Sequence, residues 1–279
     1  MSRPYRSVLY IPAANQRAME KARTLAADAI IFDLEDAVAP AEKPGARDLL
    51  RHALAQDYGG RARIVRINGF DTEWGRDDAA AFATGADAVL VPKVSRPEDL
   101  DAVAALTGET PLWAMMETAL GMLNAAAIAA HPRLEGMVMG TNDLAKELGS
   151  RNRPDRLPMQ TGLGLCLLAA RAHGLVIVDG VFNAFKDDEG LRAECQQGRD
   201  MGFDGKTLIH PAQLDIANAA FAPTEAEVDL SRRQIEAYEA AIAEGKAVAV
   251  VDGRIVENLH VETARRTLTK AQAIAALAG

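Results

Sequence analysis

Two carboxylates, Glu117 and Asp143, are the first candidates for chemistry, because each follows a short apolar run closely. Carboxylate oxygens suit Mg²⁺, which one or two acidic side chains typically hold together with waters and substrate oxygens. No cluster of histidines or cysteines is present to favour zinc. We therefore predict that Glu117 and Asp143 bind Mg²⁺. The alternative is that each side chain caps the N-terminus of the helix that follows it.

An arginine, Arg66, lies inside the apolar segment IVRIN and must point into a polar mouth or pair with a carboxylate. A fixed guanidinium can bind a substrate carboxylate or oxyanion. The alternative is a salt bridge to Glu35 or Asp36 of the segment DLED, and both roles are compatible. We predict that Glu35 and Asp36 contribute to catalysis by organising metal-bound waters or Lys43 and Arg47. A purely structural ion pair is the alternative for these two acids.

Eight short apolar runs must position these side chains, and helical patterns separate them. Because most runs are apolar throughout, they are typical of strands covered on both faces. The alternation predicts an α/β fold, a (β/α)₈ TIM barrel, with a doubly wound open sheet as the alternative. No GxGxxG segment follows the first run, which disfavours the open sheet. The predicted strands are Val8–Ile11, Ala29–Phe32, Ile64–Ile67, Ala88–Val91, Leu112–Met115, Gly136–Met139, Val176–Val178 and Thr207–Ile209, and the predicted helices include Gln16–Ala26, Glu42–Ala55, Pro97–Leu106, Ala119–Ala130, Met159–Ala172 and Glu189–Met201.

The carboxyl ends of barrel strands form the catalytic rim of this fold. A charged or polar group follows seven of the eight predicted strands, as in Pro92-Lys93 after the fourth. Alternation along the second strand would send Asp33 and Glu35 to one side and Asp36 to the other. His210 is predicted to be a hydrogen-bonded residue of the barrel. The methionines of the fifth and sixth strands are predicted to pack in the core; they are Met115, Met116, Met137 and Met139.

The last part of the chain has a different pattern. Residues 1–222 are predicted to form the catalytic barrel, and residues 223–279 a C-terminal lid or oligomerisation extension. The extension is expected to contain a helix to about Glu244, a hairpin around Asp252 and Gly253, and a last helix from about Val261 to Leu277. About 55 residues are too few for an independent core. The extension is therefore expected to pack on the barrel or on another subunit.

Composition restricts the class of protein. The net charge is −8 and no basic stripe is visible, which argues against nucleic acid as a partner. Two cysteines, Cys166 and Cys195, have no metal-binding spacing and are expected to be reduced structural thiols. No apolar run is long enough for a signal peptide or a membrane span. We therefore expect a cytoplasmic protein without a membrane partner.

Seven ordered segments resemble one known family. They are RSVLYIPA, DAIIFDLEDAV, IVRIN, PLWAMMET, MGTNDL, FKDDEG and GFDGKTLIHPAQ. These segments are similar to those of the citrate lyase β-subunit-like CoA-ester lyases within the HpcH/HpaI aldolase superfamily, from about residue 5 to the C-terminus. The resemblance is strongest to the branch of malyl-CoA lyases and malyl-CoA thioesterases. It implies a barrel with a C-terminal lid, Mg²⁺, an acyl-CoA substrate and a homotrimer or homohexamer.

The resemblance also implies roles for individual residues. It assigns the metal to Glu117 and Asp143, and the contact with the substrate oxyanion to Arg66. It places the CoA near the first strand and its loop, from Tyr10 to Arg17. Family members usually have a glycine after the proline of that loop, whereas this chain has Ala13.

The lid departs from the family pattern. Family members carry a catalytic aspartate in a segment resembling GKMID-x-P and donate it to the site of a neighbouring subunit. The corresponding segment here is GRIVENL, so Glu257 takes the position of the aspartate and the proline is absent. Glutamate can do the same acid–base work with a side chain one methylene longer. Asp252 is a second candidate, although a turn is its expected role.

These observations predict a Mg²⁺-dependent lyase that cleaves a short 3-hydroxyacyl-CoA, such as (S)-malyl-CoA, β-methylmalyl-CoA or citramalyl-CoA, by retro-Claisen chemistry. Arg66 would stabilise the thioester enolate and Glu257 would protonate it. The first alternative is a (S)-malyl-CoA thioesterase on the same scaffold. An aldolase acting on free oxo-acids and a non-catalytic subunit of a citrate-lyase-like complex are further alternatives.

Overall fold

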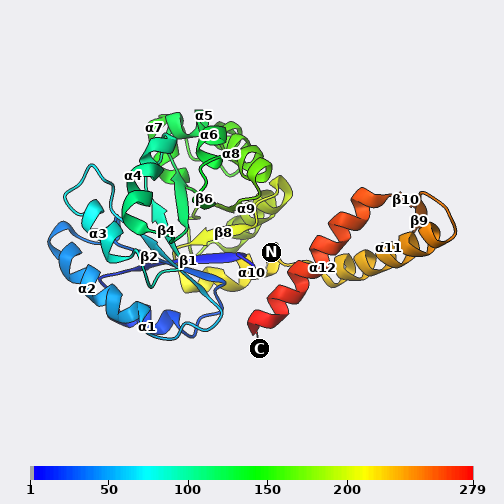
Figure 1. Cartoon of the computed structure of the whole chain (residues 1–279), viewed down its shortest axis with the longest axis horizontal. Coiled ribbons are helices and arrows are strands. Elements are labelled where there is room, and N and C mark those ends of the chain that lie inside the picture. The colour runs from blue at the N-terminus through cyan, green and yellow to red at the C-terminus, as the bar shows by residue number, and fades with distance from the viewer. Residues whose placement is uncertain (1–2, 279) are drawn as a thin grey trace. The chain divides into compact units, whose positions relative to one another are not determined.

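Eight parallel strands close into a barrel in the computed structural model, which describes residues 3–278 (Figure 1). Each strand pairs with the next along the chain, and β1 also pairs with β8, which closes the ring. The predicted TIM barrel is thus confirmed, and closure excludes the open sheet. The strands are β1 (Ser7–Pro12), β2 (Ala29–Asp33), β3 (Ala62–Arg66), β4 (Ala88–Val91), β5 (Leu112–Met116), β6 (Leu134–Met139), β7 (Val176–Asp179) and β8 (Gly205–Leu208).

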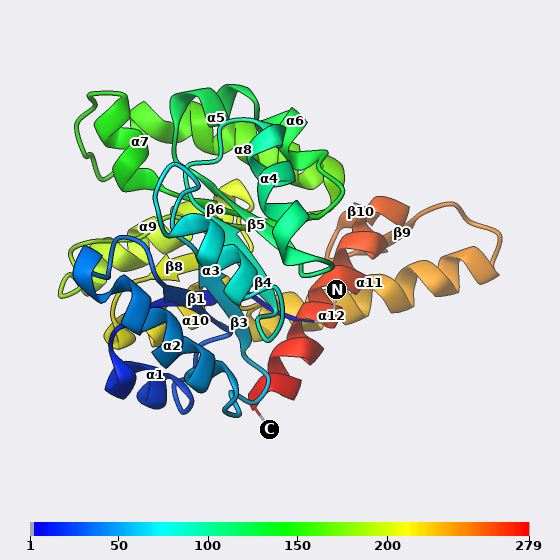
Figure 2. The same cartoon turned by 60° about the vertical axis from the view of Figure 1, so that its left-hand side comes forward.

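Helices surround the barrel, and α1 and α2 lie on the opposite side of the strands from α5 and α8 (Figure 2). The predicted helix over residues 119–130 is divided at Asn124, and two short helices, α3 and α10, are additional to the predicted ones. No helix within residues 3–278 is long and apolar enough to cross a bilayer. The helices of the barrel are α1 (Gln16–Ala22), α2 (Lys43–Leu54), α3 (Gly75–Ala81), α4 (Pro97–Thr107), α5 (Ala119–Leu123), α6 (Ala125–Ala129), α7 (Thr141–Glu147), α8 (Gln160–His173), α9 (Asp188–Met201) and α10 (Leu214–Phe221), with single 3₁₀ turns at Pro40–Glu42, Leu157–Met159 and Pro211–Gln213.

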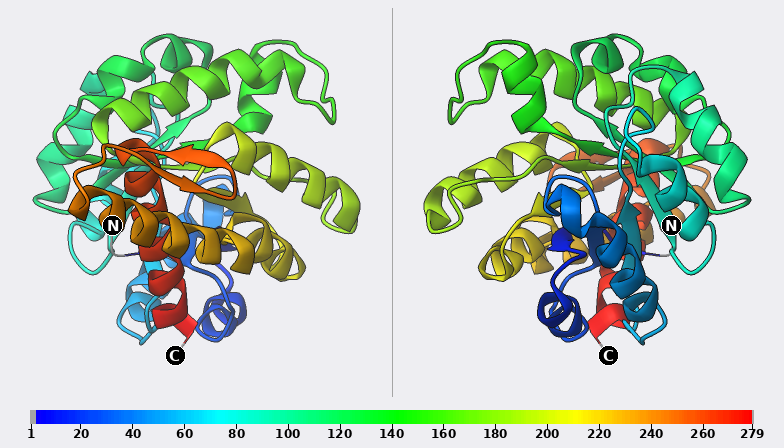
Figure 3. Two further views of the ribbon diagram at one scale, coloured as in Figure 1. Left: turned by 90° about the vertical axis from the view of Figure 1, so that its right-hand side faces the viewer. Right: turned by 90° about the vertical axis from the view of Figure 1, so that its left-hand side faces the viewer.

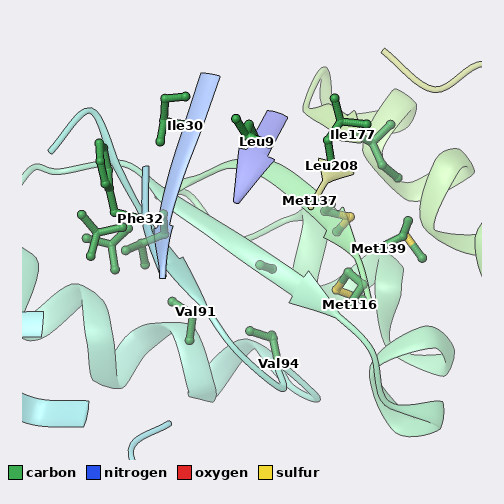
Figure 4. Close-up of a cluster of buried hydrophobic side chains, with 14 of the residues drawn as sticks. Leu9, Ile30, Phe32, Val91, Val94, Met116, Met137, Met139, Ile177 and Leu208 are labelled. Atoms are coloured by element: carbon green, nitrogen blue, oxygen red, sulfur yellow. The ribbon is translucent and has the colours of Figure 1, made fainter. Parts of the chain in front are cut away.

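The core has two layers because side chains alternate along each strand. One layer fills the space between strands and helices, and Figure 4 shows part of it, including Phe32, Met116 and Met137. The other fills the barrel interior, where Trp113 is the largest side chain. All four methionines predicted to pack in the core are buried. Met115 belongs to the interior layer, and the other three belong to the layer between strands and helices. Burial of each large apolar side chain contributes roughly 1.5–3 kcal/mol.

Strand register brings the interior-facing residues to one level at the carboxyl end. Asp33 is the last residue of β2 and lies opposite both Pro12 and Arg66. Tyr10 packs against the interior layer with Met115, two residues before Glu117. Apolar side chains therefore fill the barrel interior up to the carboxyl ends of the strands, and charged side chains lie at those ends.

Residues 222–278 form a second compact unit, together with Arg3 and Pro4. It contains α11 (Glu225–Ala243), the hairpin of β9 (Ala249–Val251) and β10 (Arg254–Val256), and α12 (Asn258–Ala278). Within this unit α11 packs against α12 and against the hairpin (Figure 3). A small apolar cluster joins these elements and consists of Ala241, Ala249, Val256 and Val261.

A glycine inside the barrel gives a test of this packing. A Cβ at Gly136 of β6 would overlap the Trp113 indole, which cannot move because it fills the interior. We predict that Gly136→Ala lowers the free energy of unfolding by about 1–3 kcal/mol, the usual cost of overpacking. Thermal denaturation followed by circular dichroism measures this.

Gly164 of α8 is the matched control, because a Cβ there meets no atom within 4 Å. Gly164→Ala should raise stability by about 0.5–1 kcal/mol through its helix propensity. Equal effects of the two substitutions would contradict the packing argument.

Candidate active site

A cavity of about 360 Å³ opens where the strands end. Its polar wall includes Asp33, Asp36, Arg66 and Asp143, and its apolar wall includes Met115, Met139, Val181 and Ile209. These residues belong to loops and strand ends from several parts of the barrel, which is the usual position of the active site in this fold. A small polar molecule with an apolar portion would fit such a cavity.

Arg66 is the central cation of the cavity. Its Nε and Nη2 donate hydrogen bonds to the two carboxylate oxygens of Asp33, at 2.7 and 2.6 Å. The guanidinium lies over the Tyr10 ring, 5.1 Å from its centre. A bidentate pair of this kind fixes the guanidinium plane. Asp33 was not predicted as a site residue, and it is the residue that orients Arg66.

Both predicted acids also contact Arg66, as expected for the salt-bridge alternative. Nη1 lies 2.9 Å from Glu35 Oε2 and 3.3 Å from Asp36 Oδ2. Strict alternation would have separated these acids, but β2 ends at Asp33 and the chain then turns. The turn is held by Asp33, whose carboxylate accepts the backbone N–H groups of Glu35 and Ala37. The expectation of alternation beyond Asp33 was therefore wrong.

Lys43 holds the same turn from behind. Its buried Nζ donates to the carbonyl oxygens of Leu34 and Glu35 at 2.8 and 2.7 Å, and to Asn68 Oδ1 at 2.6 Å. Burial lowers the pKa of Lys43, and nearby carboxylates oppose this shift. The prediction that the Glu35 side chain organises Lys43 was thus wrong in detail, because the contact is to the backbone of Glu35.

Arg47 lies outside the cavity and forms no ion pair with Glu35 or Asp36 among the described residues. It pairs instead with Asp78 at 2.8 Å and with Asp77 at 3.3 Å on α3. This part of the prediction was wrong because α3, which supplies the partners, was not foreseen.

Glu117 is buried at the end of β5. Its Oε1 accepts the backbone N–H of Lys93 at 2.8 Å. Its carboxylate lies against Gly140, where a Cβ would collide with Glu117 Cβ and Oε2. Burial, followed by the charge of Glu35, raises the pKa of Glu117 to about 8. A nearby cation would stabilise the charged form of a buried carboxylate whose pKa is raised this far.

Asp143 is half-buried in the first turn of α7, and it lines the cavity. The helix-cap alternative is wrong for both predicted metal ligands. Thr118 caps α5 with its side chain, and Gly140 is the N-cap residue of α7. Neither Glu117 nor Asp143 is therefore occupied in closing a helix.

The carboxylates at this rim suit a hard divalent cation that prefers oxygen ligands. Among the described residues no group of three or more His, Cys, Asp or Glu side chains could hold a metal by itself. Glu35 Oε2 is buried and makes no hydrogen bond of good geometry, its one described contact being the ion pair with Arg66, and burial and the charge of Glu35 raise the pKa of Glu117. Mg²⁺ needs only one or two carboxylates when water and substrate oxygens complete its shell.

Lys93 is a site residue that the sequence did not single out. Its Nζ lies 2.8 Å from Glu35 Oε1, while its backbone N–H contacts Glu117. The available signal was its position directly after β4, at the rim of the barrel. A lysine after a strand is common on solvent-exposed rims, so the residue type alone did not distinguish it.

The two residues predicted to bind CoA have different environments. Tyr10 lines the cavity, and its hydroxyl is 3.5 Å from Met115 Sδ. Burial raises the pKa of Tyr10 above its usual range, so its hydroxyl stays protonated. Arg17 is exposed on α1 and does not line this cavity. It faces solvent, as a residue that contacts the phosphates of a long ligand can.

Glu257 lies between β10 and α12 in the C-terminal unit, and its side chain is exposed. Its backbone N–H donates to His260 Nδ1 at 3.0 Å. Asp252 has a positive φ of 49° in the hairpin turn and pairs with Arg233 at 2.8 Å. The expected turn role of Asp252 is therefore confirmed, and Glu257 is the carboxylate of this segment that forms no ion pair within residues 3–278.

Other polar groups at the strand ends belong to structural contacts. Asp179 is fully buried and forms ion pairs with Arg156 at 2.7 Å and with Lys206 at 3.4 Å. His210 caps the following turn by accepting the N–H of Ala212, and its ring stacks on Phe185. His210 is thus hydrogen-bonded as predicted.

Comparison with known proteins gives a consistent result. The HpcH/HpaI aldolase/citrate lyase family matches residues 6–211. The chain is 74% identical over 275 residues to a (3S)-malyl-CoA thioesterase of Cereibacter sphaeroides, covering 98% of this chain and 96% of the relative. It is 36% identical over 285 residues to the citrate lyase subunit beta of Escherichia coli, covering 97% and 94%.

A solved structure is also similar over nearly the whole chain. The protein CitE from Mycobacterium tuberculosis, in complex with magnesium, acetoacetate and coenzyme A, superposes with a TM-score of 0.81 at 32% identity. The similarity covers 97% of this chain and 98% of that one.

The raised pKa of Glu117 predicts a specific pH dependence. Between pH 4.5 and about 8 the folded protein without metal keeps a proton on Glu117 that the unfolded chain releases, so the contribution of Glu117 to stability falls as pH rises. Glu117→Gln should remove this loss and raise the Tm at pH 8 by at least about 2 °C. Thermal denaturation in a metal chelator from pH 5 to 8.5 measures the difference.

Glu135→Gln is the control, because Glu135 is exposed on β6. Its pH profile should follow that of the unsubstituted protein. Parallel profiles for Glu117→Gln and the unsubstituted protein would show that Glu117 is not protonated in the folded state.

Proposed function

Because the chain belongs to the HpcH/HpaI aldolase/citrate lyase family, as its motifs predicted, we propose that it is a Mg²⁺-dependent thioesterase that hydrolyses (3S)-malyl-CoA to malate and CoA. The observation that carries this proposal is the 74% identity, over 98% of the chain, to relatives with that activity. The lyase expected from the sequence has weaker support than its thioesterase alternative. The relatives support the coarser prediction of an enzyme acting on a CoA ester.

Arg66 is proposed to bind the oxygen of the thioester carbonyl. Its Nε and one N–H of Nη2 are used by Asp33, and Nη1 faces both Asp36 and Glu35, so the second N–H of Nη2 remains for a ligand in the cavity. Attack of water on the thioester carbon moves an electron pair onto that oxygen, and a fixed guanidinium stabilises the resulting charge. Glu35 and Asp36 are proposed to keep Arg66 in place during this change of charge.

Glu117 and Asp143 are proposed to hold Mg²⁺, in keeping with the magnesium in the CitE complex. When bound there, Mg²⁺ would polarise substrate oxygens as a Lewis acid and offset negative charge. Asp143 and Arg66 line the same cavity, so a malyl carboxylate or hydroxyl can be held beside the thioester carbonyl. The apolar wall excludes water from the far side of the acyl chain.

Tyr10 and Arg17 are proposed to contact the CoA portion of the substrate, and the related protein CitE is itself found in complex with coenzyme A. Residues 223–279 are proposed to act as a lid and oligomerisation extension, with Glu257 as the carboxylate that activates the attacking water. A homotrimeric or homohexameric assembly and a cytoplasmic location are further proposals. The free, buried thiols of Cys166 and Cys195 agree with a reducing compartment.

The lyase is the second candidate, because the chain is also 36% identical to citrate lyase subunit beta. Both reactions place negative charge on the thioester oxygen, so the same arginine and metal can serve either one. They differ in the bond that breaks. Hydrolysis breaks C–S and consumes water, whereas retro-Claisen cleavage breaks C–C and leaves a carbon that must take up a proton. A non-catalytic subunit would catalyse neither hydrolysis nor cleavage by itself.

Product analysis tests the proposal. We expect the purified chain with Mg²⁺ and (S)-malyl-CoA to release free CoA thiol and malate in equal amounts, without glyoxylate. Arg66→Lys keeps the charge but loses the planar fork, and it should lower kcat on the order of 10²–10³-fold. Arg51→Lys on the exposed face of α2 should have no effect.

Glyoxylate and acetyl-CoA as the main products would establish the lyase instead. No turnover of malyl-, β-methylmalyl- or citramalyl-CoA would favour a non-catalytic subunit. Near-normal turnover by Arg66→Lys would remove the oxyanion role from Arg66.

The longer side chain at position 257 gives a separate prediction. Glu257→Ala should lower hydrolysis by on the order of 10²-fold or more, since a positioned base contributes about that factor. Glu257→Asp retracts the carboxylate by one methylene and should recover only part of this loss. Rates of CoA release, with Glu262→Ala on exposed α12 as the control, measure it. Unchanged hydrolysis in Glu257→Ala would exclude the proposed role.

A further inference from the structure

Lys93 has an unusual backbone at the rim of the barrel. Its φ is 53°, and only two other non-glycine residues in the described part of the chain have positive φ. A side chain in this left-handed region costs roughly 1–2 kcal/mol. Such strain persists where surrounding contacts impose it, and it is concentrated at functional sites.

Contacts with α5 impose this backbone. The hydroxyls of Ser95 and Thr118 are 2.8 Å apart, and Asn124 Nδ2 donates to the Ser95 carbonyl at 2.8 Å. The Val94 carbonyl packs so closely on Gly121 that a Cβ there would overlap it. The turn after β4 is therefore clamped to the helix that follows Glu117.

The strained turn directs two groups of Lys93 at two different carboxylates. The backbone N–H donates to Glu117 Oε1 at 2.8 Å, and Nζ donates to Glu35 Oε1 at 2.8 Å. The second oxygen of Glu117 lies on the side of Gly140, which lines the cavity. One oxygen of the proposed metal ligand is thus engaged, and the other remains available.

We propose that Lys93 is a positioning residue: its strained backbone fixes Glu117 so that Oε2 alone is offered to the cation, and its ammonium group holds Glu35 against Arg66. This inference rests on the proposed Mg²⁺ site at Glu117 and Asp143. Lys93 is not among the residues that line the cavity, so it acts through Glu35 and Glu117.

The charges around Lys93 determine what its removal does. The Lys93 side chain is about half exposed, and Asp36, Glu35 and Glu117 are the nearby acids, with Arg66 as the other cation. Loss of the ammonium group makes this cluster more negative by one charge. A divalent cation should then bind more tightly, while Glu35 loses its anchor and the alignment of Arg66 deteriorates.

The experiment compares Lys93→Met with the unsubstituted protein. Mn²⁺ affinity, measured by electron paramagnetic resonance without substrate, should become at least about threefold tighter. The kcat should fall about tenfold while KM stays within about twofold, because alignment is lost and binding is kept. Damage to the fold would weaken both metal binding and turnover, so opposite signs are the signature of positioning.

Two variants and one control separate the backbone from the ammonium group. Lys93→Gly tolerates the positive φ, so it should match Lys93→Met in Mn²⁺ affinity but have a higher Tm. Lys93→Arg keeps the charge and should leave Mn²⁺ affinity within about twofold of the original. Lys146→Met, on the exposed face of α7, should change neither quantity.

Mn²⁺ binding that is unchanged or weaker in Lys93→Met would overturn the inference. Failure of the proposed function looks different. In that case the unsubstituted protein would not bind Mn²⁺, or Glu117→Gln would bind it as well as the unsubstituted protein does.

Discussion

Five carboxylates share the mouth of the barrel, and their mutual repulsion is the constraint that the surrounding structure has to satisfy; they belong to Asp33, Glu35, Asp36, Glu117 and Asp143. Asp33, Glu35 and Asp36 all lie within 3.3 Å of Arg66 nitrogens. Glu117 extends from the end of β5, and in the described part of the chain its carboxylate accepts a single hydrogen bond, from the backbone N–H of Lys93. Burial, and then the charge of Glu35, raise the pKa of Glu117, because one guanidinium and one ammonium group do not neutralise this many acids, and a cation in the cavity would offset the remaining charge.

The barrel supplies the rigidity that such a cluster needs. Parallel strands end at one level, so side chains from β2, β3 and β5 reach one point without long loops. Backbone contacts then hold the loops, as Lys43 does for the turn after Asp33 and Asn124 does for the turn after β4. Side chains held in this way need little reorganisation when charge develops on a substrate, which is how preorganised sites accelerate reactions.

The barrel and half of the site follow from local sequence pattern. The apolar runs predicted all eight strands. The acids that follow these runs indicated Glu117 and Asp143 as rim residues, and Glu35 and Asp36 as partners of Arg66. The orientation of Asp33 depends on where β2 stops, which periodicity does not determine to a single residue. The backbone of Lys93 depends on a clamp from α5, some 30 residues later. Contacts of this range are not encoded in local periodicity.

The C-terminal unit illustrates the same distinction at a larger scale. Its hairpin was predictable because Asp252-Gly253 has a turn signal of its own, and Asp252 adopts the expected positive φ. The role of Glu257 depends on which surface the unit meets, and that surface lies outside the unit. Sequence pattern therefore gives the element that carries Glu257 but not the site that Glu257 serves.

The choice between hydrolysis and carbon–carbon cleavage depends on the same residue. In both proposed reactions Arg66 and the metal would stabilise the same thioester oxyanion, so neither group can distinguish them. The distinguishing step is whether the reacting carbon receives water or a proton, and this requires a group that is placed independently of the oxyanion contact. Glu257 is in a separate unit and has one methylene more than the family aspartate, so its carboxylate reaches a different distance from the same backbone position. Hydrolysis would need this carboxylate to take a proton from the water that attacks the thioester carbon, whereas cleavage would need it to give a proton to the carbon that is released, so the distance that Glu257 reaches decides which of the two it can do.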